Sequence, residues 1–137
     1  MADAKISALP AVITPLALTE ELPAVQSSAT KKVTVQQMLT GVIVTEAGTT
    51  RTLSASDNGK IIYCTSSSAV TINCASGLGV GFNCTIIQGG TGKVTVAPNS
   101  QTLVSYSSLF STMGQYAVIS LMAPVANTFV AAGNLGV

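Results

Sequence analysis

Charged side chains are nearly absent from the second half of this sequence. Residues 61–137 contain a single one, Lys93, among short runs of Val, Thr, Ser and Gly. Asp, Glu, Lys and Arg make up 8% of the whole chain, whereas folded soluble domains draw about 25% of their residues from these four types. Obligate subunit interfaces resemble a domain core cut in half and are depleted in charge. The sequence therefore predicts one subunit of an assembly, with much of its surface covered by other chains.

The composition also excludes several classes of function. The formal net charge is +1, and six basic residues are too few for the ~6–10 phosphate contacts of a typical DNA-binding protein. Histidine is absent, which removes the commonest general base and metal ligand. Glu20 and Glu21 are adjacent and cannot flank a sugar as the carboxylate pair of a glycan-cleaving enzyme does. We predict a protein that is not an enzyme, has no cofactor or metal, and binds neither nucleic acid nor membrane.

Three cysteines recur at ten-residue spacing, Cys64, Cys74 and Cys84. Structural zinc sites usually bring cysteines in close C-x₂₋₄-C pairs, which this spacing does not provide. An odd number of cysteines, without a recognisable secretory leader, favours reduced thiols in a protein assembled in the cytosol. We expect all three to be buried as small hydrophobic residues.

The distribution of proline residues distinguishes two parts of the chain. Residues 1–45 contain Pro10, Pro15 and Pro23, which fix φ and remove amide donors, so this arm is expected to be extended rather than helical or part of a sheet. Its apolar residues lack a core of their own and need the surface of a partner. Residues 46–137 are expected to form the β-domain.

One short helix is predicted near the end of the arm. Thr34 and Gln37 have the spacing of a capping box, and Gly41 provides the stop. The expected helix spans about Val35–Thr40.

The remainder of the chain alternates with the period of two that is typical of strands. Its connections are rich in turn formers, and Asp57 is expected to cap the turn at Asn58-Gly59. Segments 69–72 and 93–96 resemble each other at a spacing of 24, but one copy is too little to predict a repeat array. Short strands with frequent turns favour an antiparallel β-sandwich or jelly-roll-like fold. The strands are expected at 61–65, 69–73, 83–87, 93–96, 102–104, 116–121 and 128–131.

Gly89-Gly90-Thr91-Gly92-Lys93 has the look of a phosphate-binding loop. The match to the phosphate-binding motif fails at three points. Ile87 stands where the first glycine is required, Val94 follows the lysine where the motif has Ser or Thr, and a strand is expected where a helix must begin. We interpret this segment as a hairpin turn.

Several segments of the chain carry a resemblance to a known family of proteins. The segments in the arm are Ile6-Ser7-Ala8-Leu9-Pro10, Glu21-Leu22-Pro23-Ala24-Val25-Gln26, Thr30-Lys31-Lys32-Val33-Thr34 and Gln37-Met38-Leu39. Those in the β-domain include Asp57-Asn58-Gly59-Lys60, Val70-Thr71-Ile72, Gly81-Phe82-Asn83-Cys84-Thr85-Ile86-Ile87-Gln88, Gly114-Gln115-Tyr116-Ala117 and the ending Thr128-Phe129-Val130-Ala131-Ala132-Gly133-Asn134-Leu135. Together they resemble the tailed-bacteriophage virion proteins that form fibres or decorate the capsid. The resemblance implies a homotrimer, with an N-terminal arm that fastens to the virion and a small β-domain that projects from it.

Candidate site residues follow from this resemblance and from the positions of the aromatic side chains. Attachment to the virion is assigned to Ile6, Leu9, Pro10, Leu22, Pro23, Val25, Gln26, Lys31 and Lys32. The core or the trimer axis is assigned to Tyr63, Phe82, Tyr116 and Phe129. A receptor-binding tip would use Tyr106 and Phe110, although large aromatic residues more often belong to cores and interfaces.

The function that we expect is a trimeric capsid-decoration or head-fibre subunit, assembled in the host cytoplasm and anchored to the major capsid protein or another virion protein. Only Gly41–Thr50 separates the arm from the strands, which leaves no room for the long shaft of a fibre that reaches a host. The alternative is a short tail fibre or adhesin whose β-domain binds a receptor on the host surface.

Overall fold

The computed structural model describes residues 21–26, 29–34 and 41–137. The chain divides into two compact units, Met1–Thr40 and Gly41–Val137. The second unit therefore starts at Gly41, before the expected boundary at residue 46. The predicted helix at 35–40 lies outside the described residues.

The described part of the first unit is a hairpin. Strands β1 (Glu21–Gln26) and β2 (Ala29–Thr34) pair in antiparallel register, with Pro23 opposite Lys32. The expectation that proline excludes this segment from sheet pairing is therefore wrong. A two-stranded ribbon leaves half of the amides of each strand without a partner, so a residue that lacks an amide proton is tolerated there.

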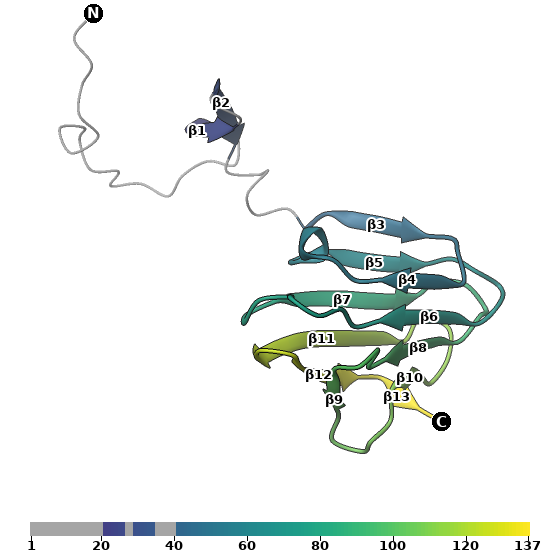
Figure 1. The fold of residues 1–137 in the computed structure, drawn as a ribbon. Helices are drawn as coiled ribbons and strands as arrows, with labels where there is room; N and C mark the ends of the chain where they lie inside the picture. The colour runs from purple at the N-terminus through teal and green to yellow at the C-terminus, as the bar shows by residue number, and fades with distance from the viewer. Residues whose placement is uncertain (1–20, 27–28, 35–40) are drawn as a thin grey trace, which may run out of the picture. The chain divides into compact units, whose positions relative to one another are not determined.

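The second unit begins with three coils of parallel β-structure, each made of two strands (Figure 1). The first coil holds β3 (Ile43–Glu46) and β4 (Thr50–Thr52), the second β5 (Ile61–Cys64) and β6 (Val70–Asn73), and the third β7 (Asn83–Gln88) and β8 (Val94–Ala97). Strands β3, β5 and β7 pair in parallel in one sheet, and β4, β6 and β8 pair in parallel in another. This arrangement is that of a short β-solenoid.

The spacing of 24 residues noticed in the sequence is the length of one coil. Val70 pairs with Val94, and Ile61 pairs with Thr85. The expected antiparallel sandwich or jelly roll is thus incorrect for these strands, although the all-β class is confirmed. The glycine- and serine-rich segments carry the chain from one sheet to the other rather than reversing it within a sheet, and a period of two does not distinguish these paths.

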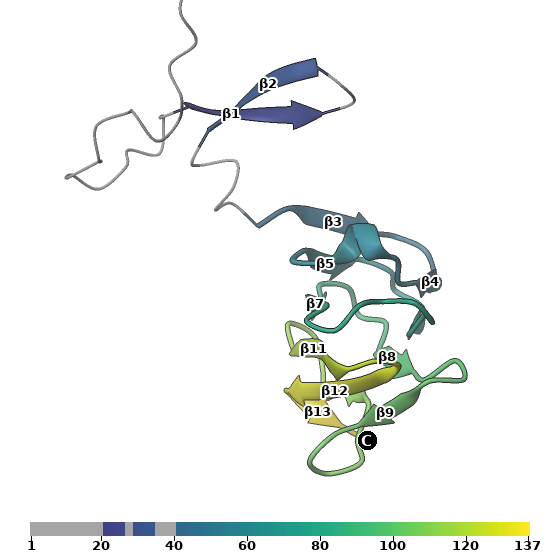
Figure 2. The same ribbon diagram turned by 60° about the vertical axis from the view of Figure 1, so that its left-hand side comes forward.

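Within the second unit, antiparallel pairing appears only after the third coil (Figure 2). Strand β11 (Val118–Val125) lies antiparallel between β7 and β12 (Thr128–Gly133), and β9 (Thr102–Val104) pairs in parallel with β12. Strand β10 (Ser111–Thr112) connects β8 to β13 (Leu135–Gly136). The resulting sheets have the orders β3-β5-β7-β11-β12-β9 and β13-β10-β8-β6-β4.

The hydrophobic core lies between the five-stranded and six-stranded sheets. Phe82 and Phe129 meet edge to face in it, with ring centroids 6.4 Å apart, a favourable geometry for aromatic pairs. The buried apolar residues of the core cluster are Leu53, Ile62, Cys64, Val70, Ile72, Cys74, Leu78, Phe82, Cys84, Ile86, Val94, Val96, Ile119, Leu121, Ala123, Phe129 and Ala131.

Successive coils also touch where the chain crosses between the sheets. The β7–β8 connection packs on the β5–β6 connection so closely that a Cβ atom on Gly92 would lie 1.9 Å from the carbonyl oxygen of Ser68. Gly92 donates its amide to the carbonyl of Ser66, and its φ is not in the left-handed region. This glycine is therefore required by the stacking of the coils, and the interpretation of residues 89–92 as a hairpin turn is wrong.

We predict that Gly92→Ala destabilises the protein by roughly 1–3 kcal/mol, the usual cost of forcing atoms into a filled space. Gly79→Ala is the matched control, because a Cβ atom there meets nothing within 4 Å, and its effect should stay within about 0.5 kcal/mol. Urea unfolding of both variants at one protein concentration measures the difference. Equal stabilities would mean that the coil connections do not stack as described.

Candidate functional site

The β unit uses most of its few charges internally. Between Gly41 and Val137 the charged residues are Glu46, Arg51, Asp57, Lys60 and Lys93. The Arg51 guanidinium lies 3.1 Å from a Glu46 oxygen and 2.6 Å from an Asp57 oxygen. Outside this ion cluster, only the two lysines carry charge over the whole unit.

The ion cluster fills the core side of the first coil. Glu46 and Arg51 occupy the inward register positions that Cys64 and Ile72 hold in the next coil. Asp57, in the 3-10 turn Ala55–Asp57, is 1% exposed. A stack of coils needs a polar terminal coil to protect its core from water, and these paired charges provide one.

Asp57 also organises the turn that carries it. Its carboxylate accepts hydrogen bonds from the backbone amide (2.9 Å) and the hydroxyl (3.1 Å) of Ser54. Asp57 caps a turn, as expected, but this is the 3-10 turn Ala55–Asp57 rather than the turn at Asn58-Gly59. Its ion pair with Arg51 was not foreseen. Burial raises the pKa of Asp57, but its hydrogen bonds with Arg51 and Ser54 and the charge of Arg51 outweigh burial, so the net pKa is lowered.

The predicted tip residues, Tyr106 and Phe110, behave differently. Tyr106 is fully exposed, with a relative accessibility of 105%. Phe110 packs partly against the core, and its carbonyl accepts the amide of Val96. The two rings therefore do not form a common exposed tip.

Tyr106 borders a groove in the β unit. This groove has a volume of about 270 Å³ and contains no ionisable side chain apart from that tyrosine. Ser105 shapes its loop by donating a hydrogen bond to the carbonyl of Leu109 (2.7 Å). The groove is lined by Tyr106, Ser107, Leu109, Val130, Ala131, Ala132, Gly133 and Leu135.

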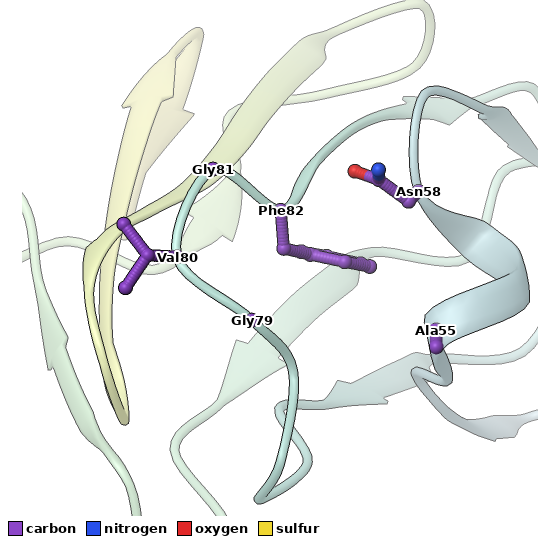
Figure 3. Close-up of a pocket in the computed structure, with 6 residues that line it drawn as sticks. All are labelled: Ala55, Asn58, Gly79, Val80, Gly81 and Phe82. Atoms are coloured by element: carbon purple, nitrogen blue, oxygen red, sulfur yellow. The ribbon is translucent and has the colours of Figure 1, made fainter.

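Another hollow is a smaller cleft of about 180 Å³ between the glycine-rich β6–β7 connection and the 3-10 turn (Figure 3). The Phe82 ring points across it toward Asn58 and Ala55. Asn58 accepts the amide of Asn83 (2.9 Å), so its side chain has a structural partner. No residue that lines the cleft is ionisable, and the cleft offers no acid, base or nucleophile.

The four aromatic residues assigned to the core or the trimer axis divide into two pairs. Phe82 and Phe129 are buried in the core. Tyr63 points outward from β5 and its ring packs over Gly89, whereas Tyr116 is 69% exposed. Tyr116 has a φ of +66°, unusual for a bulky residue, and this turn delays the start of β11 from the expected residue 116 to Val118.

The assigned attachment residues fall partly within the described hairpin. Leu22, Pro23, Val25 and Gln26 belong to β1, and Lys31 and Lys32 belong to β2. The register places Ala24 opposite Lys31. Ile6, Leu9 and Pro10 lie outside the described residues.

Burial raises the pKa of the Cys64 and Cys74 thiols to about 11 and that of Cys84 to about 12. All three are free and buried, as the sequence predicts. Thiolate is the reactive form, so these cysteines are inert at neutral pH.

Sequence analysis did not single out several large apolar side chains that the fold leaves exposed. The alternating pattern reveals two sides of each strand but does not say which side meets the core when both are apolar. These residues are Val42, Ile43, Val80, Val104, Met113, Met122, Val125 and Val137.

Within the described residues, no three His, Cys, Asp or Glu side chains gather as metal ligands, and no helix has the length and hydropathy to cross a membrane. No protein-family model matches the chain, and no curated protein gives a significant match.

We predict that Asp57→Asn destabilises the protein by about 2–3 kcal/mol at pH 7, somewhat less than the loss of a fully buried pair because Arg51 remains partly exposed. A lowered folded-state pKa contributes stability above the unfolded-state value, near 3.8, and this contribution is lost as the pH falls through the folded-state pKa. The difference from wild type should therefore shrink below about pH 4. Chemical unfolding as a function of pH measures it.

The control for this experiment is Lys60→Gln, which removes a nearby charge that has no ion-pair partner in the described residues. Its effect should stay within about 0.5 kcal/mol. If Asp57→Asn were equally mild, the ion cluster would not be what holds the first coil in place.

Proposed function

We propose that this chain is a structural subunit of a bacteriophage virion, a capsid-decoration or head-fibre protein that works as a homotrimer. The observation that carries the proposal is the neutrality of the β unit, in which only Lys60 and Lys93 carry charge outside the ion cluster. Lys93 also donates a hydrogen bond to the carbonyl of Val137. A monomer rarely exposes so much uncharged surface, whereas subunits of permanent assemblies do.

The division into two units supports separate roles for arm and β-domain. Residues 1–40 form a unit of their own, with Lys31 and Lys32 in a hairpin. In this proposal the arm contacts the major capsid protein or another virion protein. Three arms on one trimer raise the effective concentration of the remaining arms after the first has bound, so weak single contacts become firm attachment.

The small number of residues that connect the two units favours the capsid over the tail. Strand β2 ends at Thr34 and β3 begins at Ile43, which leaves no segment for a long shaft. In this proposal the trimer assembles in the host cytoplasm and becomes part of the virion.

A second candidate function, receptor binding by a short tail fibre or adhesin, is favoured by one observation. Tyr106 is fully exposed beside the groove, and an exposed aromatic ring next to a concave surface is a common element of binding sites. The neutral groove would suit an uncharged ligand on the host surface.

We predict that removing residues 1–40 leaves the trimer intact and abolishes its attachment to capsids. The β unit has its own core, so it should not need the arm in order to fold. Co-sedimentation with phage capsids prepared without the protein measures attachment, and analytical ultracentrifugation measures the oligomer.

Three results would contradict parts of this proposal. A full-length protein that sediments as a 13.8 kDa monomer at micromolar concentration would exclude the trimer. A truncated protein that still binds capsids would exclude the arm as the anchor. Full-length protein that binds host cells and ignores capsids would favour the adhesin instead.

A further inference from the structure

The six-stranded sheet has one side that faces away from the core. Side chains alternate along each strand, and the buried positions fix which set points inward. The opposite set forms a continuous surface, here called the outer face. Its residues are Ile43, Thr45, Ile61, Tyr63, Asn83, Thr85, Ile87, Thr102, Val104, Val118, Ser120, Met122, Thr128, Val130 and Ala132.

The outer face contains no charged residue. Most of its members are aliphatic or aromatic, and three of the large apolar members are exposed: Ile43 (63%), Val104 (43%) and Met122 (41%). Contiguous apolar surface of this kind on a soluble protein marks an interaction site.

The five-stranded sheet provides an internal comparison. Its outward positions form a second surface, here called the hydroxyl face, where Thr95 and Ser111 share a hydrogen bond of 2.8 Å. Threonine, which has a high strand propensity, occupies most outward positions of this second surface. Strand propensity alone therefore does not explain why the outer face has Ile, Val and Met at such positions. On β4, β6, β8 and β10 the outward residues are Thr50, Thr52, Thr71, Asn73, Thr95, Ala97 and Ser111.

We propose that the outer face is the surface through which copies of this chain meet, while the hydroxyl face remains in contact with water. This inference rests on the proposed homotrimer and identifies its interface. Three copies related by a three-fold axis would each turn the outer face toward the axis, so that the apolar side chains of all three are removed from water together. Such a ring closes with the same contact repeated three times.

The size of the outer face suits this role. Six strands about 4.8 Å apart, with about three outward positions each, make a patch on the order of 25 Å by 20 Å. A stable interface needs roughly 800 Å² of accessible surface from each partner. The outer face supplies most of that area, and the exposed residues Tyr106 and Val125 extend it.

The groove is continuous with the outer face. Val130 and Ala132 belong to both, and Leu109 and Leu135 also line the groove. A neighbouring copy that covers the outer face would therefore also reach the groove, and an apolar side chain of that copy would fill it. A second copy fits better than a charged partner, because neither the outer face nor the groove offers a group that could pair with charge.

A pair of matched substitutions tests the proposal in the full-length protein. Thr85→Lys places a charge at the centre of the outer face, on β7, and Thr71→Lys makes the same change on β6 of the hydroxyl face. Both threonines are half-buried and point outward from interior strands. We expect wild type and Thr71→Lys to be trimers, and Thr85→Lys to require at least a tenfold higher concentration for half-assembly in sedimentation experiments.

The other possible outcomes contradict different parts of the proposal. If wild type and Thr85→Lys are equally stable trimers, or if Thr71→Lys dissociates to the same extent, the outer face is not the interface although the trimer stands. If wild type is a monomer, the proposed trimer and this inference both fail.

Circular dichroism shows whether each variant has kept its fold. If Thr85→Lys does not fold, Met122→Lys replaces it, because Met122 is already partly exposed on the same face and its lysine can reach water in the monomer. A folded Met122→Lys variant with wild-type assembly would equally overturn the inference.

Discussion

The in-register stacking of three parallel coils is the constraint on which the rest of this structure depends. Pairing of β3, β5 and β7 in one sheet and of β4, β6 and β8 in the other fixes which side chains face the core. It also creates an open end at the first coil, where the core would meet water. Arg51, Glu46 and Asp57 occupy that end as a mutually paired cluster, which removes three of the few charges of the β unit from its outer surface.

The sequence predicts strands well here and their pairing poorly. The alternation of β-branched residues locates β5, β6, β7, β8, β9 and β12 to within a residue or two, because that pattern is local. Strands β10 and β13 have two residues each, too few for a periodic signal. Strand β3 lies in the segment Gly41–Thr50, interpreted as a connection between the arm and the strands, and β4 starts at the last residue of that segment. Parallel pairing depends on where the connections lead. In the sequence, a glycine that permits coils to touch, such as Gly92, looks the same as one that permits a reversal.

The candidate site was only partly predictable for a related reason. The lack of charge indicates covered surface, but only the register separates the outer face from the core, since Ile61 and Ile62 are chemically identical and point in opposite directions. Likewise, Tyr106 and Phe110 are close together in the sequence. The structure of the loop is needed to see that Tyr106 is exposed and that Phe110 packs against the core. The proposed structural role in an assembly would account for the neutral surface, whereas the polar closure of the first coil follows from the need to shield the end of the core from water.

The most direct test of this account is the accessibility of the outer face in the assembled protein. A cysteine introduced as Ser120→Cys would lie on β11 in the outer face, and Thr71→Cys would lie in the hydroxyl face, while the native thiols are buried and have raised pKa values. The account predicts that a maleimide labels Ser120→Cys at least tenfold more slowly than Thr71→Cys in the native protein, and equally fast after unfolding. Equal labelling rates in the native protein would contradict it.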